Sequence, residues 1–107
     1  MTNAVRVETT IDSREAANAL AKQLVERRLV ACAQVVGPIS STYWWEGKVT
    51  TDEEYLIVCK TAKARVDDLR SAINELHSYD VPEILAVDVD SGNPAYLDWI
   101  ESETRSQ

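Results

Sequence analysis

Residues 31–61 read ACAQVVGPISSTYWWEGKVTTDEEYLIVCKT, and this stretch decides the fold. Both of its ends are rich in β-branched and apolar residues, which is typical of β-strands. Glu46-Gly47-Lys48 lies between them and predicts the tip of a hairpin, because glycine adopts a positive φ without steric cost. Gly37-Pro38 interrupts the first arm and predicts a bend or bulge in a strand that continues beyond it. The predicted arms of the hairpin are 29–36 with 40–45, and 49–61.

The segments beside the hairpin predict a strand and a helix before it, and a helix and a strand after it. In 4–10, apolar residues alternate with charged ones, which indicates a strand with one buried face. Asp12 or Ser13 can cap the following helix by accepting its free N–H groups. The remaining predictions are helices ending near 28, over 63–77 and over 94–103, and a strand over 84–89. The order β-α-β-β-α-β with a C-terminal helix predicts one α+β, ferredoxin-like domain over 1–107.

The predicted hairpin is too long for the strands beside it. Its arms would reach about 40 Å at the usual rise per residue, whereas the first and last strands have only about seven and six residues. The tip would therefore project with unpaired strand edges and exposed Tyr43, Trp44 and Trp45. Bare edges and apolar patches of this kind favour a partner, and self-association by strand pairing would satisfy both. The residues thus predict an oligomer without giving its number of subunits.

The composition excludes two classes of partner. The 107-residue chain has a formal net charge of −7 and lacks the cationic cluster that nucleic-acid binding needs. It also lacks an apolar run of about 20 residues, the length that spans a bilayer, and its N-terminus does not resemble a signal peptide. Cys32 and Cys59 lie far apart without a C-x-x-C motif, which predicts two free thiols in a reducing compartment. We therefore expect a cytoplasmic protein with no nucleic-acid or membrane partner.

Cys32 and His77 are the candidate metal ligands. Thiolate and imidazole suit copper and zinc, so a bound Cu or Zn ion is expected to use this pair, although the chain requires no cofactor to fold. Each residue also has a structural interpretation, since a free cysteine in an apolar strand acts as a small hydrophobe and a histidine suits the end of a helix. Cys59 is expected in the core. A lone Cys–His pair is weak evidence for catalysis, and without a phosphate loop or an H-E-x-x-H motif we predict that the protein is not an enzyme.

A second candidate site combines charged residues at strand ends with the aromatic hairpin tip. Its expected members are Lys60, Glu83, Tyr43, Trp45 and Glu46. If subunits pack through their hairpins, these residues would line a cleft between subunits, since aromatic walls with a few charged groups are typical of ligand pockets. The other interpretation is an interface in which the aromatic side chains fill space and Lys60 pairs with Glu83. The expected interface residues are Tyr43, Trp44, Trp45 and Trp99.

Five motifs, in order along nearly the whole chain, resemble those of the CutA family, the divalent-cation tolerance proteins. They are Leu29-Val30-Ala31-Cys32-Ala33, Ser41-Thr42-Tyr43-Trp44-Trp45-Glu46-Gly47-Lys48, Lys60-Thr61, His77-Ser78-Tyr79-Asp80-Val81-Pro82-Glu83 and Tyr96-Leu97-Asp98-Trp99-Ile100. The resemblance implies a ferredoxin-like homotrimer related in architecture to the PII signalling proteins, with a role in tolerance to copper and other divalent cations. Ser78 departs from the family's usual proline, and Ala72 stands where some relatives have a cysteine.

Three functions follow as hypotheses. The first is a trimer that binds divalent cations, copper foremost, in the response to metal ions. The second is a PII-like sensor that binds a small ligand in the cleft between subunits. The third is a structural module that binds a protein partner and no small ligand.

Overall fold

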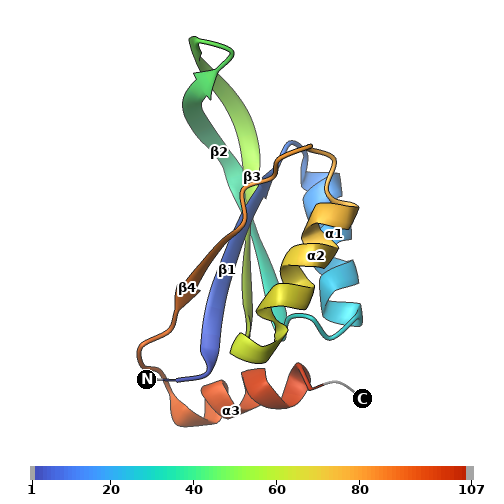
Figure 1. The fold of residues 1–107 in the computed structure, drawn as a ribbon, viewed down its shortest axis with the longest axis vertical. Helices are drawn as coiled ribbons and strands as arrows, with labels where there is room; N and C mark the ends of the chain where they lie inside the picture. The colour runs from blue at the N-terminus through green and yellow to red at the C-terminus, as the bar shows by residue number, and fades with distance from the viewer. Residues whose placement is uncertain (1, 106–107) are drawn as a thin grey trace.

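A four-stranded antiparallel sheet is the framework of the computed structural model, which describes residues 2–105. The strands lie in the order β2-β3-β1-β4, with bounds at Ala4–Ile11 (β1), Cys32–Trp45 (β2), Lys48–Ala62 (β3) and Leu85–Asp88 (β4). Helices α1 and α2 cover one face of the sheet, and α3 lies across one end of it (Figure 1). This confirms the predicted α+β, ferredoxin-like arrangement with a C-terminal helix. Residue 1 and residues 106–107 of the predicted 1–107 domain lie outside the described residues.

The helices begin and end close to where the sequence predicts. Their bounds are Arg14–Glu26 (α1), Lys63–Arg65 (the 3₁₀ turn η1), Val66–Leu76 (α2) and Pro94–Glu103 (α3). Ser13 caps α1, because its hydroxyl accepts a hydrogen bond from the Ala16 N–H at 3.1 Å, and Asn93 caps α3 in the same way. The first three residues of the helix predicted over 63–77 form the tighter 3₁₀ turn η1, and α2 continues from Val66. None of the helices in residues 2–105 is long and apolar enough to cross a membrane.

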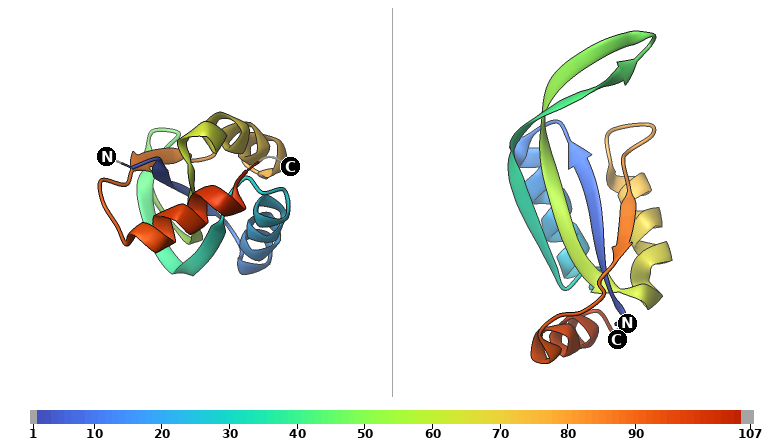
Figure 2. Two further views of the ribbon diagram at one scale, coloured as in Figure 1. Left: turned by 90° about the horizontal axis from the view of Figure 1, so that it is seen from below. Right: turned by 90° about the vertical axis from the view of Figure 1, so that its left-hand side faces the viewer.

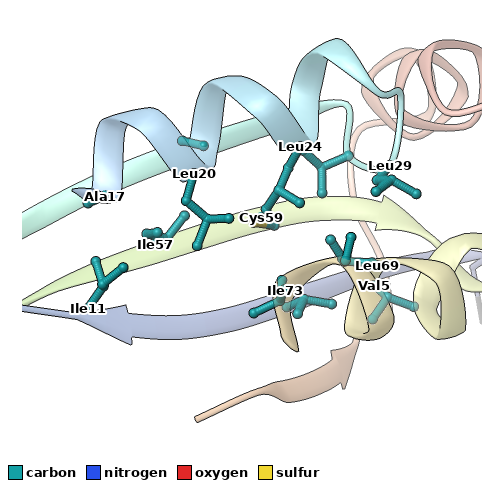
Figure 3. Packing of buried hydrophobic residues seen from close by; sticks show 14 residues of the cluster. Val5, Ile11, Ala17, Leu20, Leu24, Leu29, Ile57, Cys59, Leu69 and Ile73 are labelled. Atoms are coloured by element: carbon teal, nitrogen blue, oxygen red, sulfur yellow. The ribbon is translucent and has the colours of Figure 1, made fainter. Parts of the chain in front are cut away.

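The core lies between the sheet and the two helices that cover it (Figure 3). Leu24 of α1 and Leu69 of α2 have no exposed surface. β3 contributes Ile57 and Cys59, two positions apart, because alternate side chains of a strand point to the same face. The described helices leave the other face uncovered except at one end, where Ile100 of α3 is buried against it.

The hairpin of β2 and β3 extends well beyond the rest of the sheet (Figures 1 and 2). β3 pairs with β1 only from Tyr55 to Ala62, so the half of β3 at 48–54 pairs with β2 alone. The tip turns at Glu46 and Gly47, which have φ values of 49° and 77°. Positive φ at both central residues is the geometry of a type I′ turn, so the predicted tip is confirmed.

The irregularity predicted at Gly37-Pro38 is a shift of register within β2. The strand continues on both sides of it, with the shift between Val36 and Ile39. Gly37 has a φ of +155°, and a Cβ at this position would lie 2.7 Å from a ring carbon of Tyr55. A side chain would therefore overlap Tyr55, so the bend depends on glycine.

β4 is shorter than the predicted strand over 84–89. It pairs with β1 only where Val5–Glu8 lie alongside, and all of its residues, Leu85–Asp88, are exposed. The predicted strand also included Ile84 and Val89, which lie just outside β4. Ile84 packs against the main core, and Val89 packs against the cluster under α3. Apolar character alone therefore overestimated this strand, because burial at its ends comes from other neighbours.

Candidate functional site

Most candidate residues lie on the face of the sheet that the described helices leave uncovered, here called the open face. Ile57 and Cys59 point to the helices, so alternate residues of β3 such as Lys60 point to the open face. Cys32 lies directly opposite Lys60 and shares its face. The open face is made of Arg6, Glu8, Cys32, Gln34, Glu54, Leu56, Val58 and Lys60.

Cys32 is half-buried at the start of β2. Its Sγ lies 3.6 Å from the hydroxyl of Tyr96 in α3. Lys60, the residue opposite, donates a hydrogen bond from its ammonium group to the Gln34 side-chain oxygen. The other cysteine, Cys59, points to the core, where burial raises the pKa of its thiol to about 12. Cys59 is therefore a core thiol, as predicted, and Cys32 is the thiol on the open face.

His77 ends α2 and is 8% exposed. Its Nε2 lies 2.7 Å from the carbonyl oxygen of Thr10, and its Nδ1 lies 3.0 Å from the backbone nitrogen of Tyr79. A carbonyl oxygen only accepts and an amide N–H only donates, so Nε2 carries the proton and Nδ1 accepts. Both nitrogens of the imidazole are therefore occupied by hydrogen bonds to the backbone.

One chain does not bring Cys32 and His77 together. Cys32 lies opposite Lys60, whereas His77 bonds to Thr10, which lies opposite Leu56. Leu56 and Lys60 are four positions apart on β3, which is about 13 Å along the strand. Residues 2–105 contain no group of three His, Cys, Asp or Glu side chains arranged to hold a metal ion. The described part of one subunit therefore does not form a closed site of the usual four ligands.

Glu54 and Tyr79 form a contact that the sequence analysis did not single out. Glu54 is 9% exposed, and its Oε2 accepts a hydrogen bond from the Tyr79 hydroxyl at 2.8 Å. Burial and this bond to a carboxylate raise the pKa of the Tyr79 hydroxyl well above its usual value, so the hydroxyl stays protonated and donates. The sequence signal was weak, because Glu54 is one of two adjacent acidic residues and only their strand faces distinguish them.

Glu83 lies close to other carboxylates. Burial raises its pKa, and the nearby negative charges of Glu8 and Glu54 raise it further. Glu8 itself forms an ion pair with Arg6 at 2.7 Å. The carboxyl groups of Glu8, Glu54 and Glu83 therefore make one end of the open face acidic, and Lys60 stands at the other end.

The cleft residues predicted at the hairpin point the same way as Lys60. Tyr43 pairs with Thr50 and Trp45 with Lys48, and both partners are even-numbered positions of β3 like Lys60. The Tyr43 hydroxyl donates to Asp52, and this bond is the main cause that raises the pKa of Tyr43. Glu46 lies in the exposed turn. The set therefore spreads along one face of the sheet and hairpin rather than closing into a pocket.

Two further observations concern the predicted interface. Among the described residues Lys60 and Glu83 form no ion pair, since Lys60 bonds to Gln34. Trp99 is 41% exposed and stacks on Tyr96, with ring centroids 5.6 Å apart. These aromatic rings, like those of the hairpin, are only partly covered by the chain itself.

The chain is similar over most of its length to proteins of one family. Residues 5–103 match the family model described as CutA1 divalent ion tolerance protein. A Thermus thermophilus protein named divalent-cation tolerance protein CutA is 42% identical over 95 residues, which cover 89% of this chain and 92% of that protein. The Oryza sativa protein named Protein CutA 1, chloroplastic, is 41% identical over 92% of this chain, which spans only 56% of the rice protein's length.

The fold comparison agrees with the sequence comparison. The crystal structure of CutA from Xylella fastidiosa matches with a TM-score of 0.95 and 33% identity, covering 97% of this chain and 100% of that one.

Proposed function

This chain belongs to the CutA1 divalent ion tolerance family, and from that premise we propose that it is a homotrimer that binds divalent metal ions in a metal-ion response. The observation that carries the proposal is the projecting hairpin. Trp44 is 75% exposed and Trp45 61% exposed on a ribbon of only two strands. A ribbon of two strands is marginally stable alone, and neighbouring exposed apolar side chains are typical of association surfaces.

Further copies of the chain fit this surface. The outer edges of β2 and β4 are unpaired within the described residues, so both offer N–H and C=O groups to another strand. The apolar residues that a second copy would cover include Val36, Tyr43, Leu85 and Val87, all exposed. The number of three subunits comes from the resemblance to CutA proteins.

Copper and zinc are the proposed metals, with Cys32 and His77 as the first ligands to test. Thiolate and imidazole suit these ions, and the net charge of −7 raises the local concentration of cations. Because one chain keeps the two residues apart, an ion with several protein ligands would take them from more than one subunit. Weak or transient binding is therefore expected, rather than a resident structural metal.

Isothermal titration with Cu(II) and Zn(II), beside light scattering for mass, tests the proposal. A trimer with saturable binding that weakens in Cys32→Ser and in His77→Ala is the expected result. Cys59→Ala is the matched control, because it removes the thiol that faces the core. Unchanged affinity in both Cys32→Ser and His77→Ala would reject these ligands, and a monomer would reject the assembly.

A sensor of a small ligand is the second candidate, related in architecture to the PII proteins. It is supported by the shared direction of Lys60, Tyr43 and Trp45 and by the position of Glu83 beside the open face. A ligand that binds only the folded chain raises its melting temperature, so a thermal-shift screen distinguishes the two functions. Stabilisation by an organic anion and not by metal ions would favour the sensor. Failure of both, with a specific protein partner, would favour a partner-binding module.

No catalytic step is part of the proposal. The similar proteins of Thermus thermophilus and Pyrococcus horikoshii are named tolerance proteins, which is not an enzyme name. The open-face thiol Cys32 also lies apart from the His77 imidazole that would have to act as its base. A cytoplasmic location is proposed on the two free cysteines, which suit a reducing compartment. Fractionation of cells that express the complete protein tests the location.

A further inference from the structure

The open face of β3 carries charges of opposite sign at its two ends. Its side chains are, in order along the strand, Glu54, Leu56, Val58 and Lys60, because alternate residues share a face. Glu54 and Lys60 are six positions apart, which is about 20 Å along the strand. One chain therefore cannot bring the Lys60 ammonium group to the Glu54 carboxylate.

Lys60, at the basic end, has no carboxylate partner among residues 2–105. It takes part in none of the ion pairs there and donates instead to the neutral side-chain oxygen of Gln34. The residue directly opposite on β1 is Arg6, a second cation, which itself pairs with Glu8 at 2.7 Å. Like charges in this position destabilise a sheet, and lysine is rarely withdrawn from water unless it is paired. Lys60 is nevertheless half-buried, whereas every other lysine is exposed, so this end of the face lacks an anion.

The acidic end has the opposite imbalance. The Glu54 carboxylate is nearly buried and accepts a hydrogen bond from the Tyr79 hydroxyl, which carries no charge. Glu83 lies close by, where partial loss of solvent raises its pKa and the negative charges of Glu8 and Glu54 raise it further. In the described part of the chain neither Glu54 nor Glu83 forms an ion pair. This end of the face therefore lacks a cation.

Apolar side chains occupy the same face beside these charges. Val36, Leu85 and Val87 are 47%, 56% and 55% exposed, and each lies directly opposite an open-face residue of β1 or β3. The buried centre of a protein–protein interface is typically apolar and poor in charge, with polar residues around it. The open face has this composition, and its two ends offer complementary charges to a second copy of itself.

We propose that copies of this chain associate through their open faces, with the Lys60 ammonium group of one copy paired with the partner subunit's Glu83 at the acidic end. This contact deepens the proposed assembly and rests on it. A surface that presents both members of a complementary pair at different places joins copies head to tail, and such heterologous contacts close into rings. Each contact then supplies the anion that Lys60 lacks and the cation that the acidic end lacks. The apolar side chains around the pair would exclude solvent, which strengthens an ion pair that water would otherwise screen.

Light scattering over a dilution series tests the contact in charge-reversed variants of the whole chain. Lys60→Glu and Glu83→Lys each bring like charges together, so each should assemble only at about 100-fold higher concentration than the unaltered chain, the size expected when an interfacial charge loses its partner. The double variant with both changes restores opposite charges in every contact and the net charge of −7. It should therefore assemble like the unaltered chain.

The matched controls are Lys22→Glu, Glu75→Lys and their combination, which change the net charge in the same steps at exposed positions of α1 and α2. All three should assemble like the unaltered chain. Unchanged assembly in both open-face single variants would overturn the pairing and leave the proposed trimer and its metal binding in place. So would a loss that the double variant does not restore, because Lys60 or Glu83 would then have a different partner, or an equal loss in the controls, because net charge would then explain it. An unaltered chain that stays monomeric would remove the proposed assembly together with this contact.

Discussion

The two faces of the sheet differ in what the chain itself supplies to cover them. On one face α1 and α2 bury Ile57 and Cys59 completely, whereas on the other face Leu56 and Lys60 of the same strand remain partly exposed. The hairpin continues this contrast, since its tip carries the large aromatic residues Tyr43, Trp44 and Trp45 and none of the helices in residues 2–105 reaches it (Figure 2). Covered residues thus stabilise the single subunit, and open ones are available to stabilise an assembly.

Replacing both tip tryptophans gives the largest expected effect. Trp44→Ser with Trp45→Ser should weaken association by about 4 kcal/mol, because each buried interface tryptophan contributes about 2 kcal/mol or more. Light scattering over a dilution series should show subunits separating at concentrations where the unaltered chain stays assembled. Val25→Ser is the control, since Val25 is also an exposed apolar residue, 40% exposed, but lies on α1. A double variant that keeps its mass on dilution would contradict the role of the hairpin.

Adjacent residues of β3 give the next largest effect and the most direct comparison of the two faces. Ile57→Ala should lower the free energy of unfolding by about 3 kcal/mol, because it leaves a cavity in the helix-covered core. Leu56→Ala should cost the single subunit clearly less, since Leu56 is only partly buried on the open face. Urea unfolding in the double-tryptophan variant measures both on separated subunits. Equal losses would mean that the open face is as important to the subunit as the core.

The sequence predicts the covered side of the molecule better than the open side. Alternation in 4–10 and the Glu46-Gly47-Lys48 turn identified β1 and the hairpin, because both signals are local. The pattern began the hairpin arm at 29, whereas β2 begins at Cys32, since Leu29 and Val30 are buried before pairing starts. Local periodicity detects burial without saying which neighbour causes it.

The contacts of the candidate site are not local. Tyr79 reaches Glu54, 25 residues away in sequence, and the His77 ring reaches Thr10, 67 residues away. Both contacts depend on where the chain after α2 lies relative to β1 and β3, which no spacing in the sequence encodes. Cys32 and His77 could therefore be named as candidate ligands from their chemistry, but their separation within one chain could not.

Removing a threonine hydroxyl should lower the free energy of unfolding when the hydroxyl is buried in the core, and should change it little when the hydroxyl lies on the exposed ribbon. The Thr61 hydroxyl is fully buried and donates to the Leu29 carbonyl oxygen at 2.7 Å, so Thr61→Val should cost about 1 kcal/mol of unfolding free energy. Thr42 and Thr51 share a hydrogen bond of 3.0 Å across the exposed ribbon. Thr42→Val should change stability little, because water replaces the lost partner. Urea unfolding of the two variants side by side would show the contrast, and similar values would argue against it.

The smallest expected effect is a pH dependence at the acidic end of the open face. Burial and the charges of Glu8 and Glu54 raise the pKa of Glu83 above its usual value of 4.5, so the folded chain binds this proton more tightly than the unfolded chain does. Its contribution to stability is therefore fully present below the unfolded pKa and is lost as the pH rises through the folded pKa. Glu83→Gln, which imitates the protonated form, should raise the melting temperature at pH 7 and lose this advantage near pH 4.

Glu75→Gln is the control for that experiment, since Glu75 is exposed on α2 and its replacement removes the same charge. A higher melting temperature at pH 7 in Glu83→Gln alone would show that the effect comes from the carboxylates of the open face rather than from the net charge of −7. An equal rise in melting temperature in both variants would show that the effect comes from general repulsion among the negative charges of the chain. Because solvent screens the exposed part of Glu83, the gain should stay below the threonine effect in separated subunits. It should shrink on assembly if the partner subunit's Lys60 docks at this end, since that cation favours the ionised form of Glu83. The size of the pH effect before and after assembly therefore measures whether this end of the face lies inside the interface.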